Sequence, residues 1–556
     1  MALIGIDLGT THSLIAYYKD GKAHLIPNVH GSYLTPSVVS VEEDGNVLVG
    51  EAARERFITH PENSVHAFKR VIGTNKEWSA GKRKFRPEEL SALVLRSLKQ
   101  DAESFLNEPV VEAVISVPAY FNDIQRNATK QAAAIAGLQV TRLINEPTAA
   151  ALIYGLNDSE DDKKYLVLDL GGGTFDVTIL EYFNGVFEVH ASAGDNHLGG
   201  EDFTQVIVDW IKQECIDKKI EPISHVMAYK LAEAAKKQLT KSNTVEIQLN
   251  ENTAVQFNQT LFEKIANSLI NRIREPIIRV MQDTDLNPND FHDIVLIGGS
   301  TRMLVMHQFV TKLFKRFPRQ TENPDHVVAL GAAIQAGLIA RHEELNEIVM
   351  TDVMPYSMGI ATHNESEPEN HLFTPIIERN QTVPISKEER FTPITDKQNE
   401  VELKIYQGES RFAVNNIYLG ELSSPMPKDP KLRYVDVRFT YDVNGLLEVL
   451  AQNGSGTHQR LVIRQTEGRM SDEEVDDAFK KLAELKIHPR DKAVNKALTI
   501  RMDRLYEQFV GERRQQIGEW IDTFNKTLAS QDEKNIAADA RALQKLLDEI
   551  ENRDWF

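Results

Sequence analysis

Two short stretches of the chain combine residue types that bind phosphate and metal ions. The segment IGIDLGTTHS at 4–13 ends an apolar run on Asp7 and continues with a glycine and two threonines, and VLDLGGGTFD at 167–176 repeats this pattern around Asp169. A carboxylate at the end of a buried strand is costly unless a cation meets it. A glycine turn after the strand can direct its backbone N–H groups at an anion. Together the stretches predict a polyphosphate site in which Asp7 and Asp169 hold Mg²⁺, directly or through water.

The two stretches align as copies of one unit. Laying IGIDLGTTHSLIAYY over LVLDLGGGTFDVTIL pairs Asp7 with Asp169 and Gly9 with Gly171, an offset of 169 − 7 = 162 positions. For a single copy, a plain strand-ending turn is an equally good interpretation, but two copies with threonines at their tips favour the phosphate site. The nucleotide motifs G-x-x-x-x-G-K-[ST] and G-x-G-x-x-G are not matched. A third glycine turn, LIGGSTR at 296–302, is placed to approach a nucleoside.

The hydrophobic period divides the chain into units that must position these turns. Up to about residue 345, β-rich runs alternate with helical stretches, which is typical of an α/β domain. The clearest helical stretches are 88–106, 123–137, 202–216 and 325–341. Strand alternation then continues to about 465, and helical periodicity returns from Ser471 onward. The expected units are an α/β domain at 1–346, a linker at 347–353, a β domain at 354–468 and a helical unit at 469–556.

Composition limits the classes of function. The formal charge of −19 over 556 residues disfavours a nucleic-acid partner, because such proteins gather Lys and Arg on one face. A single cysteine, Cys215, cannot form an internal disulfide. The first residues lack the features of a secretory signal, and no run reaches the roughly 18 apolar residues of a membrane helix. We expect a cytoplasmic monomer with no membrane partner.

Seven motifs in a fixed order carry a resemblance that covers nearly the whole sequence. They are GIDLGTTHS, VPAYFNDIQR, INEPTAAAL, DLGGGTFDV, GDNHLGGEDF, GGSTRM and NPDHVVALGAAIQAG. The chain resembles the seventy-kilodalton heat-shock chaperones of the DnaK type, and His12, a shortened segment after Lys69-Arg70 and a short tail resemble their HscC-like branch. The resemblance implies a multidomain fold: an actin-like α/β ATPase domain of two duplicated lobes, then a β-sandwich peptide-binding domain, then a short α-helical lid.

The resemblance also implies roles for residues of the cleft. The catalytic set would be Lys69, Glu146, Thr174 and Asp176. Lys69 would lie near the γ-phosphate, where its charge stabilises the transfer, and Glu146 and Asp176 would position the attacking water and accept its proton. Asp7 and Asp169 would order the waters of Mg²⁺, with K⁺ as a second candidate ion. The residues implied to bind ATP or ADP are Thr10, Thr11, Gly171, Gly172, Gly173, Thr174, Glu233, Lys237, Thr240, Gly298, Gly299, Ser300, Arg302 and Asp325.

One member of this set departs from the family pattern. Lys237 stands where an arginine is usual, and a guanidinium stacks on adenine better than an ammonium does, so nucleotide affinity is expected to be weaker. Outside the motifs, Lys69, Glu233 and Lys237 would each be interpreted as a solvated charge. The motifs reverse that interpretation.

The β region resembles a substrate-binding sandwich, in which an extended peptide meets backbone hydrogen bonds and apolar pockets. The implied groove positions are Ile360, Thr362, His363, Phe391, Ile394, Val401 and Leu403. For Val401 and Leu403 taken alone, an ordinary core position is the better interpretation. His363 and Ile394 stand where methionine and a small residue are common, so both changes bear on peptide selectivity.

Four further residues resemble coupling positions of the family. Pro118 and Arg126 match a relay between the cleft and the domain interface, and Arg142 and Asp352 match positions that a J-domain partner uses. For Pro118, a simple strand end is an equal alternative. The linker segment IVMTDV carries Thr351 where an aliphatic residue is usual, which weakens its expected docking.

The implied function is an ATP-dependent chaperone that binds extended apolar segments of unfolded or client proteins. ATP hydrolysis, stimulated by a J-domain partner, would close the peptide groove. Two alternatives stay open: a small-molecule kinase of the actin/hexokinase superfamily, which leaves residues 350–556 without a role, and a regulatory ATP-binding protein that hydrolyses too slowly to cycle. The short stretch at 240–261 predicts that the usual bacterial exchange factor is dispensable. The client and the J-domain partner are not named by the sequence.

Overall fold

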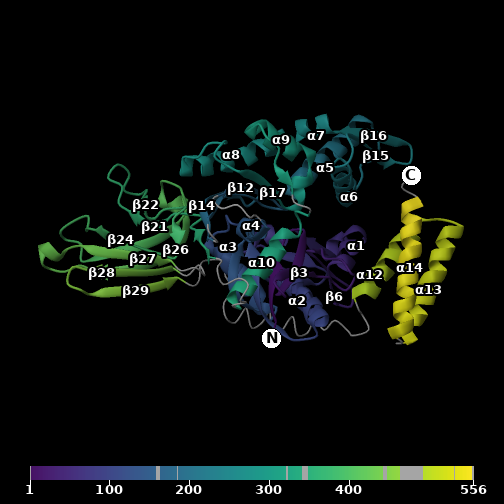
Figure 1. Ribbon diagram of the computed structural model, residues 1–556, viewed down its shortest axis with the longest axis horizontal. Coiled ribbons are helices and arrows are strands. Elements are labelled where there is room, and N and C mark those ends of the chain that lie inside the picture. The colour runs from purple at the N-terminus through teal and green to yellow at the C-terminus, as the bar shows by residue number, and fades with distance from the viewer. Residues whose placement is uncertain are drawn as a thin grey trace.

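A computed structural model shows an α/β region with a β-sandwich at one end and three tail helices at the other (Figure 1). The residues that the structure describes are 2–157, 163–183, 186–320, 323–340, 349–441, 447–463, 493–530 and 533–553. The domain boundaries predicted at 346/347 and 468/469 lie outside them. None of the described helices is both long and apolar enough to cross a membrane.

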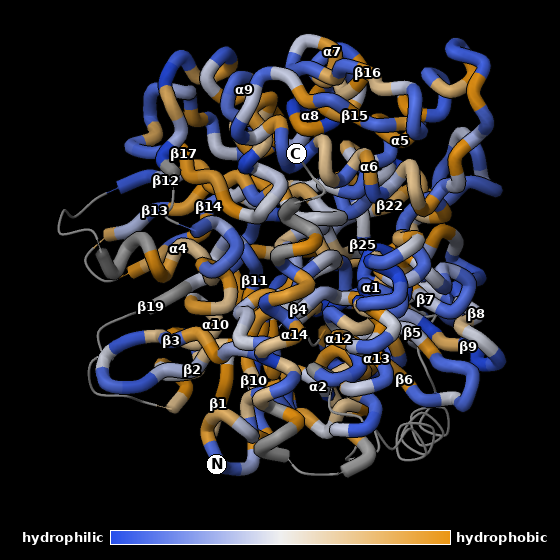
Figure 2. Tube along the Cα trace, turned by 90° about the vertical axis from the view of Figure 1, so that its right-hand side faces the viewer, coloured by the Kyte–Doolittle hydropathy of each residue, from blue (hydrophilic) through white to orange (hydrophobic). Residues whose placement is uncertain are grey.

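The first lobe is built on a mixed sheet in the order β11-β10-β1-β2-β3. Its strands are β1 (Ala2–Asp7), β2 (His12–Lys19), β3 (Lys22–Ile26), β10 (Val110–Val117) and β11 (Gln139–Asn145), and β4 (Thr35–Pro36) pairs with β2. Smaller sheets beside it are formed by β5 (Val38–Val41), β6 (Val47–Val49) and β7 (Ser64–His66), and by β8 (Trp78–Ala80) and β9 (Arg83–Phe85). The central strand β1 is parallel to β10 and antiparallel to β2. Apolar residues dominate these central strands, while the surrounding loops are hydrophilic (Figure 2).

The second lobe repeats this plan in the order β18-β17-β12-β13-β14-β19. Its strands are β12 (Lys163–Leu170), β13 (Phe175–Phe183), β14 (Val186–Asp195), β17 (Asp293–Ile297), β18 (Arg319–Gln320) and β19 (Val349–Met350). Strand β12 is antiparallel to β13 and parallel to β17, so it has the same kind of neighbours as β1. A separate hairpin joins β15 (Thr244–Asn250) to β16 (Thr253–Asn258). The duplication inferred from the two motifs is therefore visible as two equivalent strand–turn–strand units.

Helices pack on both sheets and between the lobes. They are α1 (Glu51–Thr59), α2 (Pro87–Leu106), α3 (Asp123–Ile135), α4 (Glu146–Asn157), α5 (Gly200–Asp217), α6 (His225–Gln238), α7 (Gln259–Ile265), α8 (Asn267–Thr284), α9 (Leu304–Phe314) and α10 (Val327–Ile339). Helices α4 and α10 approach so closely that a Cβ at Gly331 would lie 1.8 Å from the carbonyl oxygen of Ala149. Glycine is required there, because any side chain would push apart the two helices that join the lobes.

The β region forms a sandwich of two four-stranded antiparallel sheets, β22-β21-β25-β26 and β24-β27-β28-β29. The strands are β21 (Met358–Thr362), β22 (Leu372–Ile377), β24 (Ile385–Phe391), β25 (Glu400–Gln407), β26 (Ile417–Pro425), β27 (Val435–Tyr441), β28 (Leu447–Asn453) and β29 (His458–Ile463). Alternate residues of β27 and β28, such as Val437, Phe439 and Val449, point into one shared apolar core.

The tail helices α12 (Ala493–Gln508), α13 (Glu512–Ser530) and α14 (Glu533–Arg553) lie on the far side of the α/β region from the sandwich (Figure 1). Helix α12 contacts α1 through Ala497 against Ala52 and Ala53. At the same contact, Arg504 Nε donates to Glu55 Oε2 at 2.9 Å, and Lys496 pairs with Glu42. In this arrangement these three helices do not cover the sandwich.

Candidate functional site

The two glycine turns after β1 and β12 meet in the space between the lobes. A Cβ at Gly172 would lie 2.5 Å from Thr11 Cγ2, so glycine is what allows the turns to approach this closely. Each turn is held from behind: Ser37 Oγ donates to the Gly9 carbonyl at 2.8 Å, and Ser300 Oγ donates to the Gly171 carbonyl at 2.8 Å. The structure thus brings together two turns that are far apart in the sequence.

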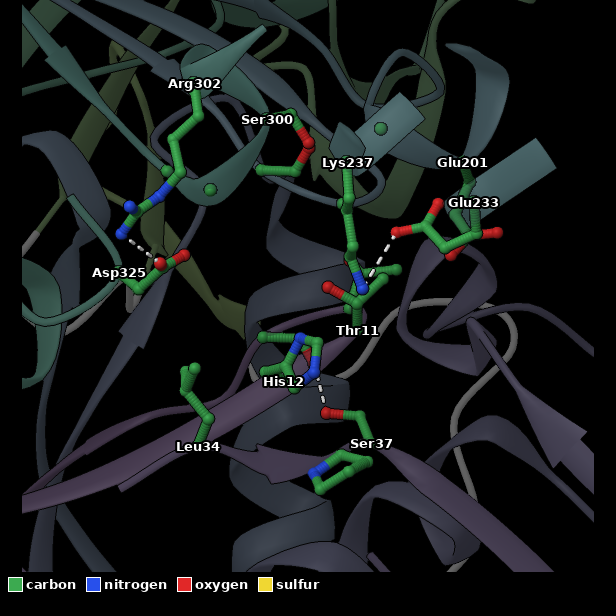
Figure 3. Close-up of a pocket in the computed structure, with 18 of the residues that line it drawn as sticks. Thr11, His12, Leu34, Ser37, Glu201, Glu233, Lys237, Ser300, Arg302 and Asp325 are labelled. Carbon is green, nitrogen blue, oxygen red and sulfur yellow. Dashed lines mark hydrogen bonds and ion pairs between the residues drawn. The ribbon is translucent and has the colours of Figure 1, made fainter. Parts of the chain in front are cut away.

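A cavity of about 670 Å³ opens beside these turns, which is within the usual range for a small-molecule site. Seventeen of the predicted cleft residues line it: Asp7, Thr10, Thr11, Lys69, Glu146, Asp169, Gly171, Gly172, Thr174, Glu233, Lys237, Thr240, Gly298, Gly299, Ser300, Arg302 and Asp325. Two predicted residues, Gly173 and Asp176, are not part of its wall. Figure 3 shows residues from both lobes facing each other across the cavity.

A cluster of enclosed charges lies at the phosphate end of the cavity. Lys69, in the 3₁₀ turn Phe68–Val71, is 3% exposed, and its Nζ lies 2.8 Å from Glu146 Oε1. Asp7 accepts a hydrogen bond from Ser116 Oγ at 2.8 Å. Asp169 lies directly across the β12–β13 pair from Asp176. Four carboxylates thus surround one ammonium group.

This crowding changes how the carboxyl groups titrate. Burial, followed by repulsion from Glu146, raises the pKa of Asp7 to about 7 and that of Asp176 to about 7. The pKa of Asp169 is raised well above its ordinary value by burial, by Glu146 and then by Asp176. Lys69 opposes all three shifts without cancelling them. The cluster therefore carries more negative charge than its own cation can balance.

The opposite end of the cavity has the charged groups expected around a nucleoside. Burial would raise the pKa of Glu233, but the ammonium groups of Lys236 and Lys237 outweigh it and hold that pKa at about 2. Arg302 Nη2 lies 2.7 Å from Asp325 Oδ2. Thr240 Oγ1 donates to the Lys237 carbonyl at 2.7 Å. Glu233, Lys236 and Lys237 belong to α6, Thr240 follows that helix, and Arg302 and Asp325 follow β17 and β18.

Lys236 and Tyr120 contact predicted site residues and were not identified from the sequence. Lys236 Nζ lies 2.7 Å from Glu233 Oε2 and donates to the Gly200 carbonyl at 2.9 Å, whereas Lys237 is mostly exposed. Helical spacing could have found it, because residues three and four apart share one face of a helix. The Tyr120 backbone N–H donates to Asp176 Oδ1 at 3.0 Å, and no local pattern marks that contact.

Asp352, which lies in the predicted linker, is joined to the cleft by the Asn145 side chain. Asn145 Nδ2 donates to Asp352 Oδ2 at 2.5 Å, and Arg126 Nη2 donates to Asn145 Oδ1 at 2.7 Å. Asn145 directly precedes Glu146 in the sequence. The positive charge of Arg142 also acts on Asp352, although burial is the main effect and raises the Asp352 pKa. Three of the predicted coupling residues are therefore neighbours.

Pro118, the fourth predicted coupling residue, follows the end of β10. Its carbonyl accepts the Phe121 N–H at 3.1 Å, which closes a turn before α3. Arg126 holds the same turn by donating to the carbonyls of Ala119 and Phe121, each at 3.0 Å. Pro118 thus lies beside the Arg126 contacts.

The sandwich is docked on the α/β region by buried polar contacts. Tyr441 Oη donates to Asp123 Oδ1 at 2.7 Å, and the Asp123 N–H donates to Gln407 Oε1 at 3.2 Å. Tyr356 Oη donates to the Tyr120 carbonyl at 3.1 Å, with the two ring centroids 4.3 Å apart. Because Tyr120 also contacts Asp176, the sandwich lies within a few bonds of the charge cluster.

A second docking contact lies on α8. Both guanidinium edges of Arg379 reach acids: Nη2 is 2.7 Å from Asp283 Oδ1, and Nη1 is 2.6 Å from Glu409 Oε2. Asn380 Nδ2 also donates to Asp283 Oδ2 at 2.7 Å, and its Oδ1 accepts the Ser192 N–H at 3.0 Å. These contacts fix the segment after β22 against β14 and α8.

The predicted groove residues are dispersed in this arrangement. Ile360 and Leu403 are each 1% exposed and belong to the sandwich core, while Phe391 and Val401 pack against that core half-buried. Ile394 is 60% exposed. The remaining predicted positions, Thr362 and His363, are half-buried, and Thr362 Oγ1 is 2.8 Å from Thr374 Oγ1. Their role toward a peptide stays a prediction.

Comparison with known proteins decides the family. A model of the family described as Hsp70 protein matches residues 3–80 and 76–555. The chain belongs to the Hsp70 family. Chaperone protein DnaK of Thermotoga neapolitana and that of Thermotoga maritima are each 39% identical over 559 residues, covering 94% of this chain and 93% of the relative. Chaperone protein DnaK of Thermosipho africanus is 41% identical over 481 residues, covering 83% of this chain and 79% of the relative.

Family membership confirms the predicted family and the general function. As an Hsp70 protein, this chain is an ATP-dependent chaperone and an ATP hydrolase. The family also implies binding of ATP or ADP and an actin-like ATPase domain followed by a β-sandwich and a helical lid. The observed mixed α/β multidomain fold agrees with this description.

Proposed function

We propose that this Hsp70 protein hydrolyses ATP in the cavity between the lobes. The conformational change that accompanies hydrolysis controls how the sandwich binds an extended apolar peptide. The observation that carries the proposal is the contact between the two glycine turns beside the Lys69–Glu146 pair. Backbone N–H groups of both turns can approach a polyphosphate, with Thr10, Thr11 and Thr174 at their tips.

The charge cluster suits Mg²⁺. Asp7, Asp169 and Asp176 are hard oxygen donors held in an anionic environment, and Asp176 Oδ2 is buried without a hydrogen-bond partner among the described residues. Within the same part of the chain, no three acidic, histidine or cysteine side chains form a direct ligand set. We therefore assign Asp7 and Asp169 to hold the ion largely through water. When bound, Mg²⁺ would neutralise charge on the phosphates.

Each residue of the cluster can then be given a separate role in ATP hydrolysis. Lys69 offers a desolvated positive charge for the phosphoryl group that is transferred, where it is worth more than in water. Asp176 lies just behind the cavity wall, with Oδ1 fixed by the Tyr120 N–H and Oδ2 without a partner among the described residues, so we assign Oδ2 as the atom that accepts a proton from water. Its pKa of about 7 is near that of an effective general base. Glu146, held by Lys69, positions that water.

The docked sandwich supports the coupling part of the proposal. Asp352 contacts Asn145 beside Glu146, and Tyr356 contacts Tyr120 beside Asp176. Peptide binding that alters docking would thus disturb both cleft carboxylates. We assign stimulation of hydrolysis to a J-domain partner acting at Arg142 and Asp352, and peptide contact to the predicted groove residues once the sandwich is released.

Single-turnover hydrolysis tests the proposal directly. We expect Thr174→Ala to slow hydrolysis by about 100-fold, the usual effect of removing one group that stabilises the transition state, and to remove stimulation by a J-domain. Thr178→Ala is the matched control: Thr178 lies on β13, the strand that directly follows Thr174, and its hydroxyl contacts Ser192 instead of lining the cavity. Equal rates for both variants would contradict the assigned site.

Peptide exchange tests the coupling. A labelled, extended apolar peptide should dissociate faster from the wild type when ATP is added, and Thr174→Ala should still release it, because release needs ATP binding and not hydrolysis. A peptide that never binds, or whose release ignores ATP, would contradict the proposal even if hydrolysis is normal.

A further inference from the structure

His12 is a cavity residue to which neither the family resemblance nor the proposed chemistry gives a role. It is the first residue of β2, directly after the threonines of the first phosphate turn, and it pairs with Pro36 of β4. Its side chain lines the cavity. Figure 3 shows the imidazole beside Thr11, with Lys237 and Glu233 above it to the right and Asp325 above it to the left.

Charged groups surround the imidazole. The charged groups that act on it are Lys237 and Glu233 of α6, Arg54 of α1 and Asp325 after β18. Burial, followed by the positive charges of Lys237 and Arg54, lowers the pKa of His12 to about 4, while Asp325 and Glu233 oppose the shift. Without nucleotide, His12 is therefore neutral at pH 7.

We propose that His12 binds the nucleotide where the ribose joins the α-phosphate and that it takes up a proton when the polyphosphate enters the cavity. The location follows from two observations: His12 directly follows the threonines that would contact the phosphates, and it lies near the charges of Lys237, Glu233 and Asp325, which would hold the nucleoside. The proton uptake follows from charge: a phosphate beside the ring favours the imidazolium, and it offsets the Lys237 and Arg54 charges that now disfavour it.

Proton uptake by His12 determines whether nucleotide affinity rises or falls with pH. A group that binds a proton more tightly in the complex makes nucleotide binding stronger as the pH falls. If the phosphate restores the ordinary pKa of about 6.5, ADP should bind about fourfold more tightly at pH 6 than at pH 8, with uptake of about half a proton at pH 6.5. This inference rests on the proposed placement of nucleotide in the cavity.

Calorimetry on the full chain in two buffers of different ionisation enthalpy measures this uptake. ADP is titrated into the wild type, His12→Asn and His66→Asn; His66 lines the same cavity, but its ring packs on Phe57 and Tyr229. Comparing variants removes the titration of ADP itself. We expect the extra uptake and the fourfold pH effect in the wild type and in His66→Asn, neither of them in His12→Asn, and no uptake with adenosine.

Several outcomes would overturn the inference. Equal proton uptake in wild type and His12→Asn, or the same uptake with adenosine, would show that His12 does not sense the phosphate. Should His12→Asn fail to fold, titration of the ¹⁵N-histidine-labelled wild type decides, with the signal assigned by its loss in His12→Gln: an imidazole pKa unmoved by ADP refutes the proposal. If ADP does not bind the wild type at all, it is the proposed function that fails.

Discussion

Replacing Thr351 by valine should strengthen the docking of the linker. Strand β19 extends the sheet of the second lobe by pairing Val349 with Val186 and Met350 with Phe187. The Thr351 N–H continues this ladder by donating to the Phe187 carbonyl at 2.9 Å. Its hydroxyl, however, is buried with no hydrogen-bond partner in the described part of the chain. The backbone of Thr351 therefore favours docking while its hydroxyl opposes it.

The gain in docking free energy can be estimated from the buried hydroxyl of Thr351. A buried polar group without a partner costs about 1–3 kcal/mol, whereas the same hydroxyl is hydrated when the linker is released. Valine has nearly the same shape and lacks the hydroxyl, so Thr351→Val should gain at least about 1 kcal/mol of docking free energy. That value corresponds to a ratio of docked to released linker about five times larger.

Hydrogen exchange of the amides at 349–353 in the presence of ATP measures this ratio. We expect exchange in Thr351→Val to be about fivefold slower than in the wild type. Thr351→Ser is the control, since it keeps the hydroxyl and loses only the methyl group, and it should exchange no more slowly than the wild type. Exchange in Thr351→Val that matches or exceeds the wild-type rate would refute the reasoning.

Three other substitutions test the titration, the nucleoside end and the interface. Burial raises the pKa of Asp101 to about 7, although a hydrogen bond from the Val29 N–H opposes the shift. The folded state therefore binds more protons than the unfolded state between about pH 4 and 7. The free energy of unfolding should fall as the pH rises through that window, by up to about 1.4 kcal/mol per pH unit. Urea unfolding at pH 5 and 8 should show this loss reduced in Asp101→Asn, and an unchanged loss contradicts it. Lys237→Arg should tighten ADP binding by about 0.5–1 kcal/mol in calorimetry, because a guanidinium can stack on the base; weaker binding would show that the ammonium is preferred. Tyr441→Phe removes the hydrogen bond to Asp123 and should cost about 1.5–3 kcal/mol of docking, seen as faster exchange at 349–353; exchange at the wild-type rate would mean that this bond does not hold the sandwich.

Local patterns were sufficient for the elements and for most of the cavity wall. The helical periods at 88–106 and 123–137 correspond to α2 and α3, which end at Leu106 and Ile135, because the apolar spacing of a helix is a property of neighbouring residues. The two Asp-Leu-Gly turns could be recognised in the same way, since the pattern of an apolar strand followed by a glycine turn spans only a few neighbouring residues. Their close approach could not, because it depends on the packing of both lobes.

Contacts between segments that are far apart in the sequence could not be predicted from local patterns. Tyr441 and Asp123 are separated by 318 positions, and neither stands in a pattern that marks an interface. The choice between Lys236 and Lys237 also required the fold: both lie within reach of Glu233, and only the packing of α5 against α6 shows that Lys236 is enclosed. Which member of such a pair is buried is set by tertiary contacts that no single segment contains.

Asp176 is connected to the sandwich through hydrogen bonds of the Tyr120 backbone. Its Oδ1 accepts the Tyr120 N–H, and the carbonyl of the same Tyr120 accepts the Tyr356 hydroxyl from the sandwich. The two groups lie in adjacent peptide planes that meet at the Tyr120 Cα, so a movement of Tyr356 that draws on the Tyr120 carbonyl reaches the Tyr120 N–H through rotation about the φ and ψ angles of that residue. An acid with a raised pKa is sensitive to the loss of a single donor, because that donor favours its charged form. Undocking of the sandwich should therefore raise the pKa of Asp176 further and leave less of its carboxylate free to accept a proton at neutral pH.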